Sequence, residues 1–114
     1  MDPVCVMNMS YRFMRILVFF DLPITTLENK RSYREFRKYL MRNGFMMLQE
    51  SVYCKIALNA VVANAIINNV KHNLPPDGLV QLLTVTERQF SRMEVLVGEA
   101  HDEVLNSDER LVIL

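Results

Sequence analysis

Residues 12–20 alternate between two apolar faces and stop at Asp21-Leu22-Pro23. One face would carry Phe13, Leu17 and Phe19, and the other Met14, Ile16, Val18 and Phe20. Two apolar faces are typical of a central strand that is covered on both sides. Because Pro23 cannot donate to a strand ladder, the strand should end there. The pattern therefore predicts a buried central strand with one carboxylate, Asp21, at its end.

Apolar positions at helical spacing follow this strand. Residues 25–43 begin with Thr25 or Thr26 as N-cap and end at Asn43-Gly44, which favours a helix stop. Tyr33, Phe36 and Leu40 fall on one narrow stripe that should face the core. Most of the basic residues of this helix fall on the opposite side.

The rest of the chain alternates between strand and helix patterns. Residues 45–49 and 52–58 indicate two strands, either a tight hairpin or one long bent strand with a bulge. Asn59 should cap a helix over 60–73, with Val62, Ala65, Ile66 and Val70 inward. The later elements are a turn at 75–78, a strand at 79–85, a helical turn at 86–89 with Gln89 in a capping box, and strands at 93–97 and 110–114.

This order predicts an α+β domain of the ferredoxin-like βαββαβ class with additional C-terminal strands. Both helices would cover one face of an antiparallel sheet. The opening strand is apolar on its other face as well, and a monomer rarely exposes such a patch. A face-to-face homodimer is the simplest way to cover it.

Composition narrows the class of protein. The chain has 114 residues, enough for one domain, and 51% of them are hydrophobic, which favours a packed core over disorder. No apolar run approaches the roughly 20 residues that span a bilayer, so we expect no membrane partner. Cys5 and Cys54 lie far apart and form no zinc-ligand spacing, which favours a reducing, cytoplasmic setting.

Charge is segregated although the net charge is zero. Residues 1–58 carry nine Lys or Arg against five Asp or Glu, and residues 59–114 carry four against eight. The helix over 25–43 holds six bases, namely Lys30, Arg31, Arg34, Arg37, Lys38 and Arg42. Arginine grips phosphate as a fork, so this helix is a candidate nucleic-acid-binding surface that would read no sequence. A merely solvated helix face is the alternative.

Asp21 is the candidate catalytic and metal-binding residue. It could simply form the turn before Leu-Pro, bonded to local amides. Alternatively it binds Mg²⁺, which keeps most of its waters and often needs only one or two carboxylates. A two-fold axis beside Asp21 would supply the second carboxylate, and the metal would activate a water for phosphodiester hydrolysis.

The remaining candidates are weaker. Ser51 and Tyr53 fit turn chemistry and a half-buried strand tyrosine, and His72 and His101 have no neighbours at ligand spacing. The apolar end of the chain, Leu111, Val112, Ile113 and Leu114, must pair with something. It could close the domain's own sheet, exchange onto a second copy, or add to another protein's sheet edge.

An ordered set of blocks resembles the CRISPR-associated protein two family in its type II-A form. The blocks are residues 9–23, 33–40, 44–45, Ser51-Val52-Tyr53, 83–87, Gln89-Phe90, Arg92-Met93 and 109–112. The resemblance covers nearly all of 9–114, so we expect one domain over 9–114 with residues 1–8 as an extension outside it.

The resemblance implies a homodimer in the CRISPR spacer-acquisition complex. There the dimer would bridge two dimers of the integrase subunit, in a heterohexameric complex, and hold a double-stranded DNA protospacer for insertion into the CRISPR array. It also implies a metal-dependent endonuclease acting on RNA or DNA, with the family's metal-binding Asp at Asp21. We favour the scaffold as the working role, because one carboxylate per chain offers no separate general base.

Overall fold

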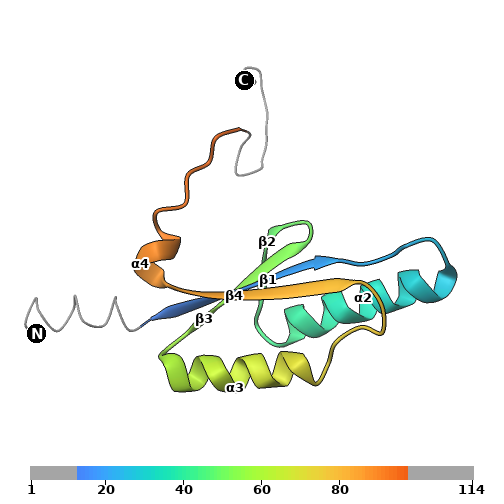
Figure 1. Cartoon of the computed structure of the whole chain (residues 1–114), viewed down its shortest axis with the longest axis horizontal. Helices are drawn as coiled ribbons and strands as arrows, with labels where there is room; N and C mark the ends of the chain where they lie inside the picture. The colour runs from blue at the N-terminus through green and yellow to red at the C-terminus, as the bar shows by residue number, and fades with distance from the viewer. Residues whose placement is uncertain (1–12, 98–114) are drawn as a thin grey trace, which may run out of the picture.

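The computed structural model describes residues 13–97, and their strands form one antiparallel sheet. The elements are β1 (Met14–Asp21), α2 (Leu27–Arg42), β2 (Met46–Gln49), β3 (Val52–Ala57), α3 (Ala60–Lys71), β4 (Leu79–Thr86) and α4 (Glu87–Phe90). The strand order is β2-β3-β1-β4, so β1 is central as predicted. Helices α2 and α3 lie on one face of the sheet (Figure 1). The ferredoxin-like α+β arrangement is therefore confirmed.

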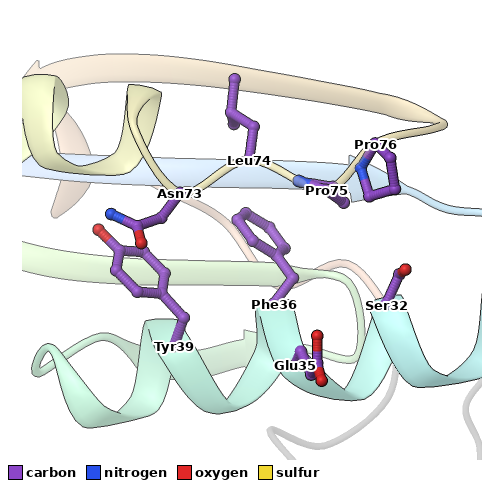
Figure 2. A pocket seen from close by; sticks show the side chains of 8 residues that line it. All are labelled: Ser32, Glu35, Phe36, Tyr39, Asn73, Leu74, Pro75 and Pro76. Atoms are coloured by element: carbon purple, nitrogen blue, oxygen red, sulfur yellow. The ribbon is translucent and has the colours of Figure 1, made fainter.

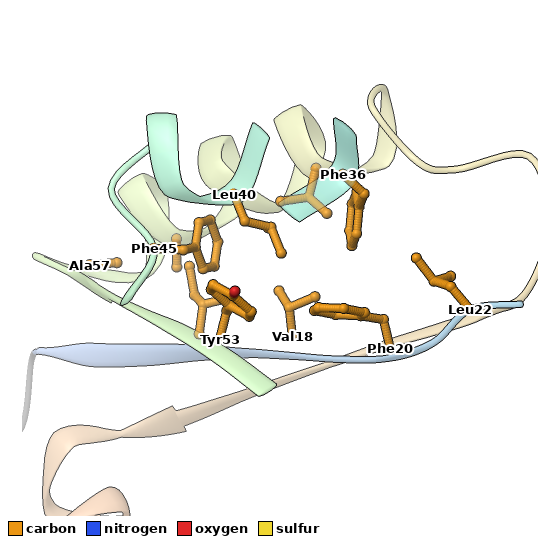
Figure 3. Close-up of a cluster of buried hydrophobic side chains, with 11 residues drawn as sticks. Val18, Phe20, Leu22, Phe36, Leu40, Phe45, Tyr53 and Ala57 are labelled. Atoms are coloured by element: carbon orange, nitrogen blue, oxygen red, sulfur yellow. The ribbon is translucent and has the colours of Figure 1, made fainter. Parts of the chain in front are cut away.

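The core lies between this sheet and the two helices (Figure 3). Its buried side chains include Ile16, Val18 and Phe20 of β1, Phe36 and Leu40 of α2, Tyr53 and Ala57 of β3, and Ala63 and Val70 of α3. The ring of Phe20 packs edge-on against Phe36, with the ring centroids 5.4 Å apart. Full burial of each such side chain stabilises the fold by about 1.5–3 kcal/mol. The even-numbered side of β1 is thus the side that holds the helices.

Local signals place the element ends. The side chain of Thr26 accepts a hydrogen bond from the amide of Asn29 at the start of α2, and Asn59 does the same for Val62 at the start of α3. The capping box at α4 is present, with reciprocal hydrogen bonds between Thr86 and Gln89. Each cap satisfies amides that the helix leaves unpaired and so sets the residue at which the helix starts. The observed starts lie within a residue or two of the predicted ones.

Residues 46–57 form a hairpin rather than one bent strand. Strand β2 pairs antiparallel with β3, and the register shifts between Met47 and Gln49, which marks a bulge. The hairpin alternative is therefore confirmed, and the bulge that was expected for a bent strand lies within the hairpin. Because β2 pairs only with β3, it lies at one edge of the sheet.

Gly78 fixes the start of β4 against the end of β1. Its φ angle is +97°, which favours glycine. A Cβ atom here would lie 2.7 Å from Cδ2 of Leu22 and 2.8 Å from the carbonyl oxygen of Asp21. The turn can therefore pack this closely only without a side chain, and it brings Leu79 into register with Asp21.

Two predictions of structure were wrong. Residues 93–97 form no strand within the described part of the chain, and their apolar side chains are exposed. They follow α4 away from the sheet (Figure 1), so their β propensity finds no ladder to join. In α3 Val70 is buried and Ile66 packs against the core as predicted, but Val62 and Ala65 are exposed and Ala63 is buried in their place. The face of α3 that packs on the sheet is therefore centred on Ala63, Ile66 and Val70.

The second face of the sheet is covered by neither α2 nor α3, and within residues 13–97 only the short helix α4 contacts it, at one end through Arg15. We call it the open face; it presents apolar side chains from three strands, namely Leu17, Phe19, Cys54, Ile56, Leu79 and Leu83. Leu17 is buried, but Ile56, Leu79 and Leu83 are 49%, 55% and 50% exposed. A half-exposed apolar sheet face of this size is unusual for a protein that acts alone. No helix of residues 13–97 has the length and apolarity to cross a bilayer.

Candidate nucleic-acid interface and metal centre

The six predicted bases of α2 are all exposed. We call Lys30, Arg31, Arg34, Arg37, Lys38 and Arg42 the basic helix surface. All of them except Arg37 lie on the side of α2 away from Phe36 and Leu40, which the helix buries in the core. With the exception of Arg37, these bases make no side-chain hydrogen bond or ion pair to residues 13–97. Their charges therefore remain free to contact a polyanion.

Arg37 differs from the other five. Its Nε donates a hydrogen bond of 2.7 Å to the hydroxyl of Tyr53 on β3. This bond raises the pKa of Arg37 above its ordinary value, which already keeps the side chain charged at physiological pH. The tyrosine ring is fully buried, not half-buried as predicted, and lies 5.6 Å from the ring of Phe20. Sequence spacing alone gave no sign that these two residues would meet.

Asp21 ends β1 at the open face and is exposed. It lies on the rim of a hollow of about 200 Å³ lined also by Phe19, Phe20, Ser51, Val52, Leu79 and Gln81. The amide of Phe20 donates to the carbonyl of Ser51 at 3.1 Å, which holds the β2–β3 turn beside the end of β1. Ser51 and Gln81 thus bring polar side chains to the surroundings of Asp21. Ser51 comes from the turn between β2 and β3, and Gln81 comes from β4. The sequence pattern did not predict that Gln81 would lie near Asp21.

The side chains around Asp21 show whether one chain alone could bind the predicted Mg²⁺. Within residues 13–97 no three His, Cys, Asp or Glu side chains lie close enough together to hold a metal ion. One exposed carboxylate fits only a cation that keeps most of its water, and Mg²⁺ is such a cation. A second carboxylate would have to come from another copy of the chain. Asp21 therefore fits a shared magnesium site rather than one built by a single chain.

The other candidates have structural roles or lie outside the described residues. Nδ1 of His72 lies 2.7 Å from the carbonyl oxygen of Asn68, one turn earlier in α3. Cys54 is a buried free thiol on the open face. Cys5, His101 and the predicted partner-binding strand at 110–114, which includes Leu111, Val112, Ile113 and Leu114, lie outside residues 13–97.

Arg15 and Glu87 form an ion pair that the sequence pattern did not predict. Nε of Arg15 donates to Oε1 of Glu87 at 3.0 Å, and Nη2 donates to Oε2 at 2.5 Å. The guanidinium also lies 4.1 Å from the ring centroid of Phe90. A charged residue inside the apolar run 13–20 was the signal that a partner had to exist. The pair fastens α4 to the end of the open face.

A second hollow of about 280 Å³ lies between α2 and the loop after α3 (Figure 2). Its lining residues are Ser32, Glu35, Phe36, Tyr39, Asn73, Leu74, Pro75 and Pro76. The hydroxyl of Tyr39 donates to Oδ1 of Asn69 at its edge, and burial raises the pKa of Tyr39. Because the lining holds one carboxylate and no base, this hollow does not suit a phosphate.

The similarity of this chain to known proteins covers all of the candidate site residues within 14–93. A family model described as "CRISPR associated protein Cas2" matches residues 14–93. That span runs from the first residue of β1 to beyond α4, so it includes Asp21, the basic helix surface and the Arg15–Glu87 pair.

Several individual proteins are similar over most of the chain. A protein of Treponema denticola named "CRISPR-associated endoribonuclease Cas2" is 52% identical over 101 residues, which is 89% of this chain and 100% of that protein. A protein of Streptococcus mutans with the same name is 48% identical over 89% of this chain and 93% of its own length. One from Ligilactobacillus salivarius, also with that name, is 43% identical over 89% of this chain and all of its own.

Proposed function

The chain belongs to the CRISPR-associated protein Cas2 family, and from that premise we propose that it acts in CRISPR spacer acquisition as a DNA-holding scaffold. In this role a homodimer binds the backbone of a protospacer duplex. It bridges two dimers of the integrase subunit while the duplex is inserted into the CRISPR array.

The basic helix surface is the observation that carries the proposal. Five of its six bases have no partner within residues 13–97, and all six are exposed on one helix. A protein that neutralises several phosphates releases counterions, so its affinity depends steeply on salt and little on sequence. A protein that must accept any spacer sequence requires this kind of contact.

The open face supports the homodimer. Ile56, Leu79 and Leu83 are about half exposed in the single chain, and Leu83 pairs with buried Leu17. Two copies joined through this face would remove these side chains from water and would place the basic helix surface of each copy on the outside. The duplex would then meet two basic surfaces related by a two-fold axis.

The integrase contact is proposed for the end of the chain. Residues 110–114 hold Arg110 and an apolar run at 111–114, and they would add as a strand to the edge of a partner's sheet. Removal of 110–114 should abolish integrase association in size-exclusion chromatography. A normal complex with the shortened chain would limit these residues to the protein's own fold.

Charge reversal tests the DNA-binding role. The triple variant Arg34→Glu, Lys38→Glu, Arg42→Glu should weaken binding to duplexes of unrelated sequence alike, and it should lower the slope of log affinity against log salt. Lys71→Glu, an exposed base on α3, is the control and should bind as the unchanged protein does. Equal affinities of the triple variant and the unchanged protein at low salt would refute the proposal.

A second candidate function is a Mg²⁺-dependent endoribonuclease. Relatives with 43–52% identity are named endoribonucleases, and Asp21 lies exposed on the rim of a hollow at the open face. In a dimer joined through this face, Asp21 of both copies would hold the ion. Bound Mg²⁺ would activate water and neutralise charge on a phosphodiester. The residues of this chain would contribute the two carboxylates and the basic helix surface that binds the backbone.

Asp21→Asn separates the two functions. If the chain is a nuclease, cleavage of RNA or DNA in Mg²⁺ should disappear while the fold survives, because Asp21 is exposed. If the chain is a scaffold, spacer insertion by the complex reconstituted with the integrase should be unchanged. Each assay is read on the same protein preparation, so the two roles are measured independently.

A further inference from the structure

We propose that Tyr53 is a positioning residue, which holds the guanidinium of Arg37 in a fixed orientation so that both Nη groups can grip a backbone phosphate. This inference rests on the proposed DNA-binding role of the basic helix surface. It goes beyond that role because it assigns a function to a buried residue that no nucleic acid can touch.

The phenol of Tyr53 is rigidly held. Its side chain is 0% exposed and its ring lies 5.6 Å from that of Phe20. Phe20 in turn packs against Tyr33 and Phe36 of α2, with centroid distances of 5.9 and 5.4 Å. The hydroxyl oxygen is therefore a fixed acceptor at the base of α2, and it takes its hydrogen bond from Nε of Arg37 at 2.7 Å.

Because Nε of Arg37 is bonded to Tyr53, only the remaining nitrogens of the guanidinium can bind a phosphate. An arginine can offer phosphate either its Nε and one Nη or both Nη groups. Since Nε is engaged, only the fork formed by the two Nη groups remains. Arg37 is exposed, and its side chain makes no other hydrogen bond to residues 13–97. The free fork is thus held on the surface of α2 before any ligand arrives.

Preorganisation separates Arg37 from its neighbours. Arg31, Arg34 and Arg42 have no such anchor within the described residues, so each loses rotamer freedom when it binds a phosphate. Arg37 has lost that freedom already in folding. We therefore expect Arg37 to contribute more to duplex affinity than an unanchored arginine of the same helix, and to depend on Tyr53 for the difference.

The test is a double-mutant cycle on duplex affinity, with salt dependence as the second measurement. Arg37→Ala should weaken binding about tenfold and lower the salt slope by about one for each chain that contacts the duplex. Tyr53→Phe should weaken binding about threefold with the salt slope unchanged, because the charge remains but its orientation is lost. The double variant should bind no more weakly than Arg37→Ala alone.

Two controls separate positioning from general damage to the fold. Tyr39→Phe removes the hydroxyl of a tyrosine on α2 that is bonded to Asn69 and not to an arginine, and it should leave affinity unchanged. Combined with Arg34→Ala, Tyr53→Phe should multiply the two effects, because Arg34 does not contact Tyr53. Thermal melting of each variant is recorded beside the binding curves.

The inference is overturned if Tyr53→Phe binds as tightly as the unchanged protein, even if its melting temperature falls, or if the effects of Tyr53→Phe and Arg37→Ala multiply. A protein whose Arg34, Lys38 and Arg42 variants bind weakly while Arg37→Ala binds normally would refute this inference alone. A protein that binds no duplex in low salt would refute the proposed function, and this inference with it.

Discussion

Arg15 and Glu87 lie near opposite ends of the described chain and meet through two nitrogens of the guanidinium, Nε and Nη2, and both carboxylate oxygens. Arg15 belongs to the central strand β1, and Glu87 opens α4, where the chain leaves the sheet. The pair is mostly shielded from water, since the side chains are 11% and 30% exposed. It therefore fixes the point at which the chain departs toward its C-terminal end.

Glu87→Gln should lower the free energy of unfolding by about 1–2 kcal/mol, because it replaces a charge-assisted contact with a neutral one at a partly exposed site. Chemical denaturation at pH 7 measures the change. Glu94→Gln, an exposed residue with no hydrogen bond or ion pair to residues 13–97, is the control and should change stability by less than about 0.5 kcal/mol. Equal stabilities of the two variants would contradict the prediction.

The ion pair between Arg15 and Glu87 also predicts how stability depends on pH. Its hydrogen bond to Glu87 raises the pKa of Arg15 above its ordinary value. A raised pKa means that the contribution of Arg15 is complete below its unfolded pKa and is lost only as the pH rises through the higher, folded value. The stability gap between the unchanged protein and Arg15→Gln should therefore stay constant from pH 7 to about pH 11.

Tyr39→Phe should change the alkaline stability of the protein. Burial raises the pKa of Tyr39 above its ordinary value of 10.0. Its contribution is thus complete below pH 10 and is lost as the pH rises through the folded value. The difference in unfolding free energy between the unchanged protein and Tyr39→Phe should be constant from pH 7 to 9 and should shrink above pH 10. Because the other tyrosines ionise in both proteins, they cancel in this difference.

Gly78→Ala should destabilise the protein by about 1–3 kcal/mol, because alanine is strained at a φ of +97° and its Cβ would meet Leu22 and Asp21. Thermal unfolding measures the loss. Gly44 has a similar φ of +87°, but a Cβ there would meet only the flexible end of Lys55. Gly44→Ala should accordingly cost less, and an equal loss at both sites would show that contact with the end of β1 contributes nothing.

Ile56→Lys with Leu83→Lys should convert the proposed homodimer into a folded monomer. Both side chains are about half exposed on the open face, so charges there can be solvated in a single chain but not in a joined pair. Sedimentation equilibrium gives the mass, and circular dichroism confirms the fold. Val61→Lys on α3, where Val61 is 78% exposed, is the matched control and should leave the mass unchanged.

Features that depend on neighbours in the sequence were predicted well. The caps at Thr26, Asn59 and Thr86 are local, because a side chain bonds an amide three residues on. The order of strands and helices follows from period alone, and it was enough to predict the sheet and the side on which α2 places its bases.

Features that depend on distant contacts were not predictable in the same way. Residues 93–97 have strand propensity, but a strand needs a partner and none is offered within the described chain. Which side of α3 faces inward depends on its packing against the sheet, where Ala63 is buried and Val62 is exposed. Likewise the bond between Arg37 and Tyr53, and the presence of Gln81 beside Asp21, arise only from how α2 and β4 lie on the sheet.

The bulge between Met47 and Gln49 has a consequence for how the protein behaves when concentrated. Strand β2 is an edge, and Met46, Met47 and Leu48 are exposed on it. A flat edge of this kind would recruit further chains into fibrils. Four residues interrupted by a bulge offer too short and too twisted a template for such growth, so the irregularity protects the protein against aggregation.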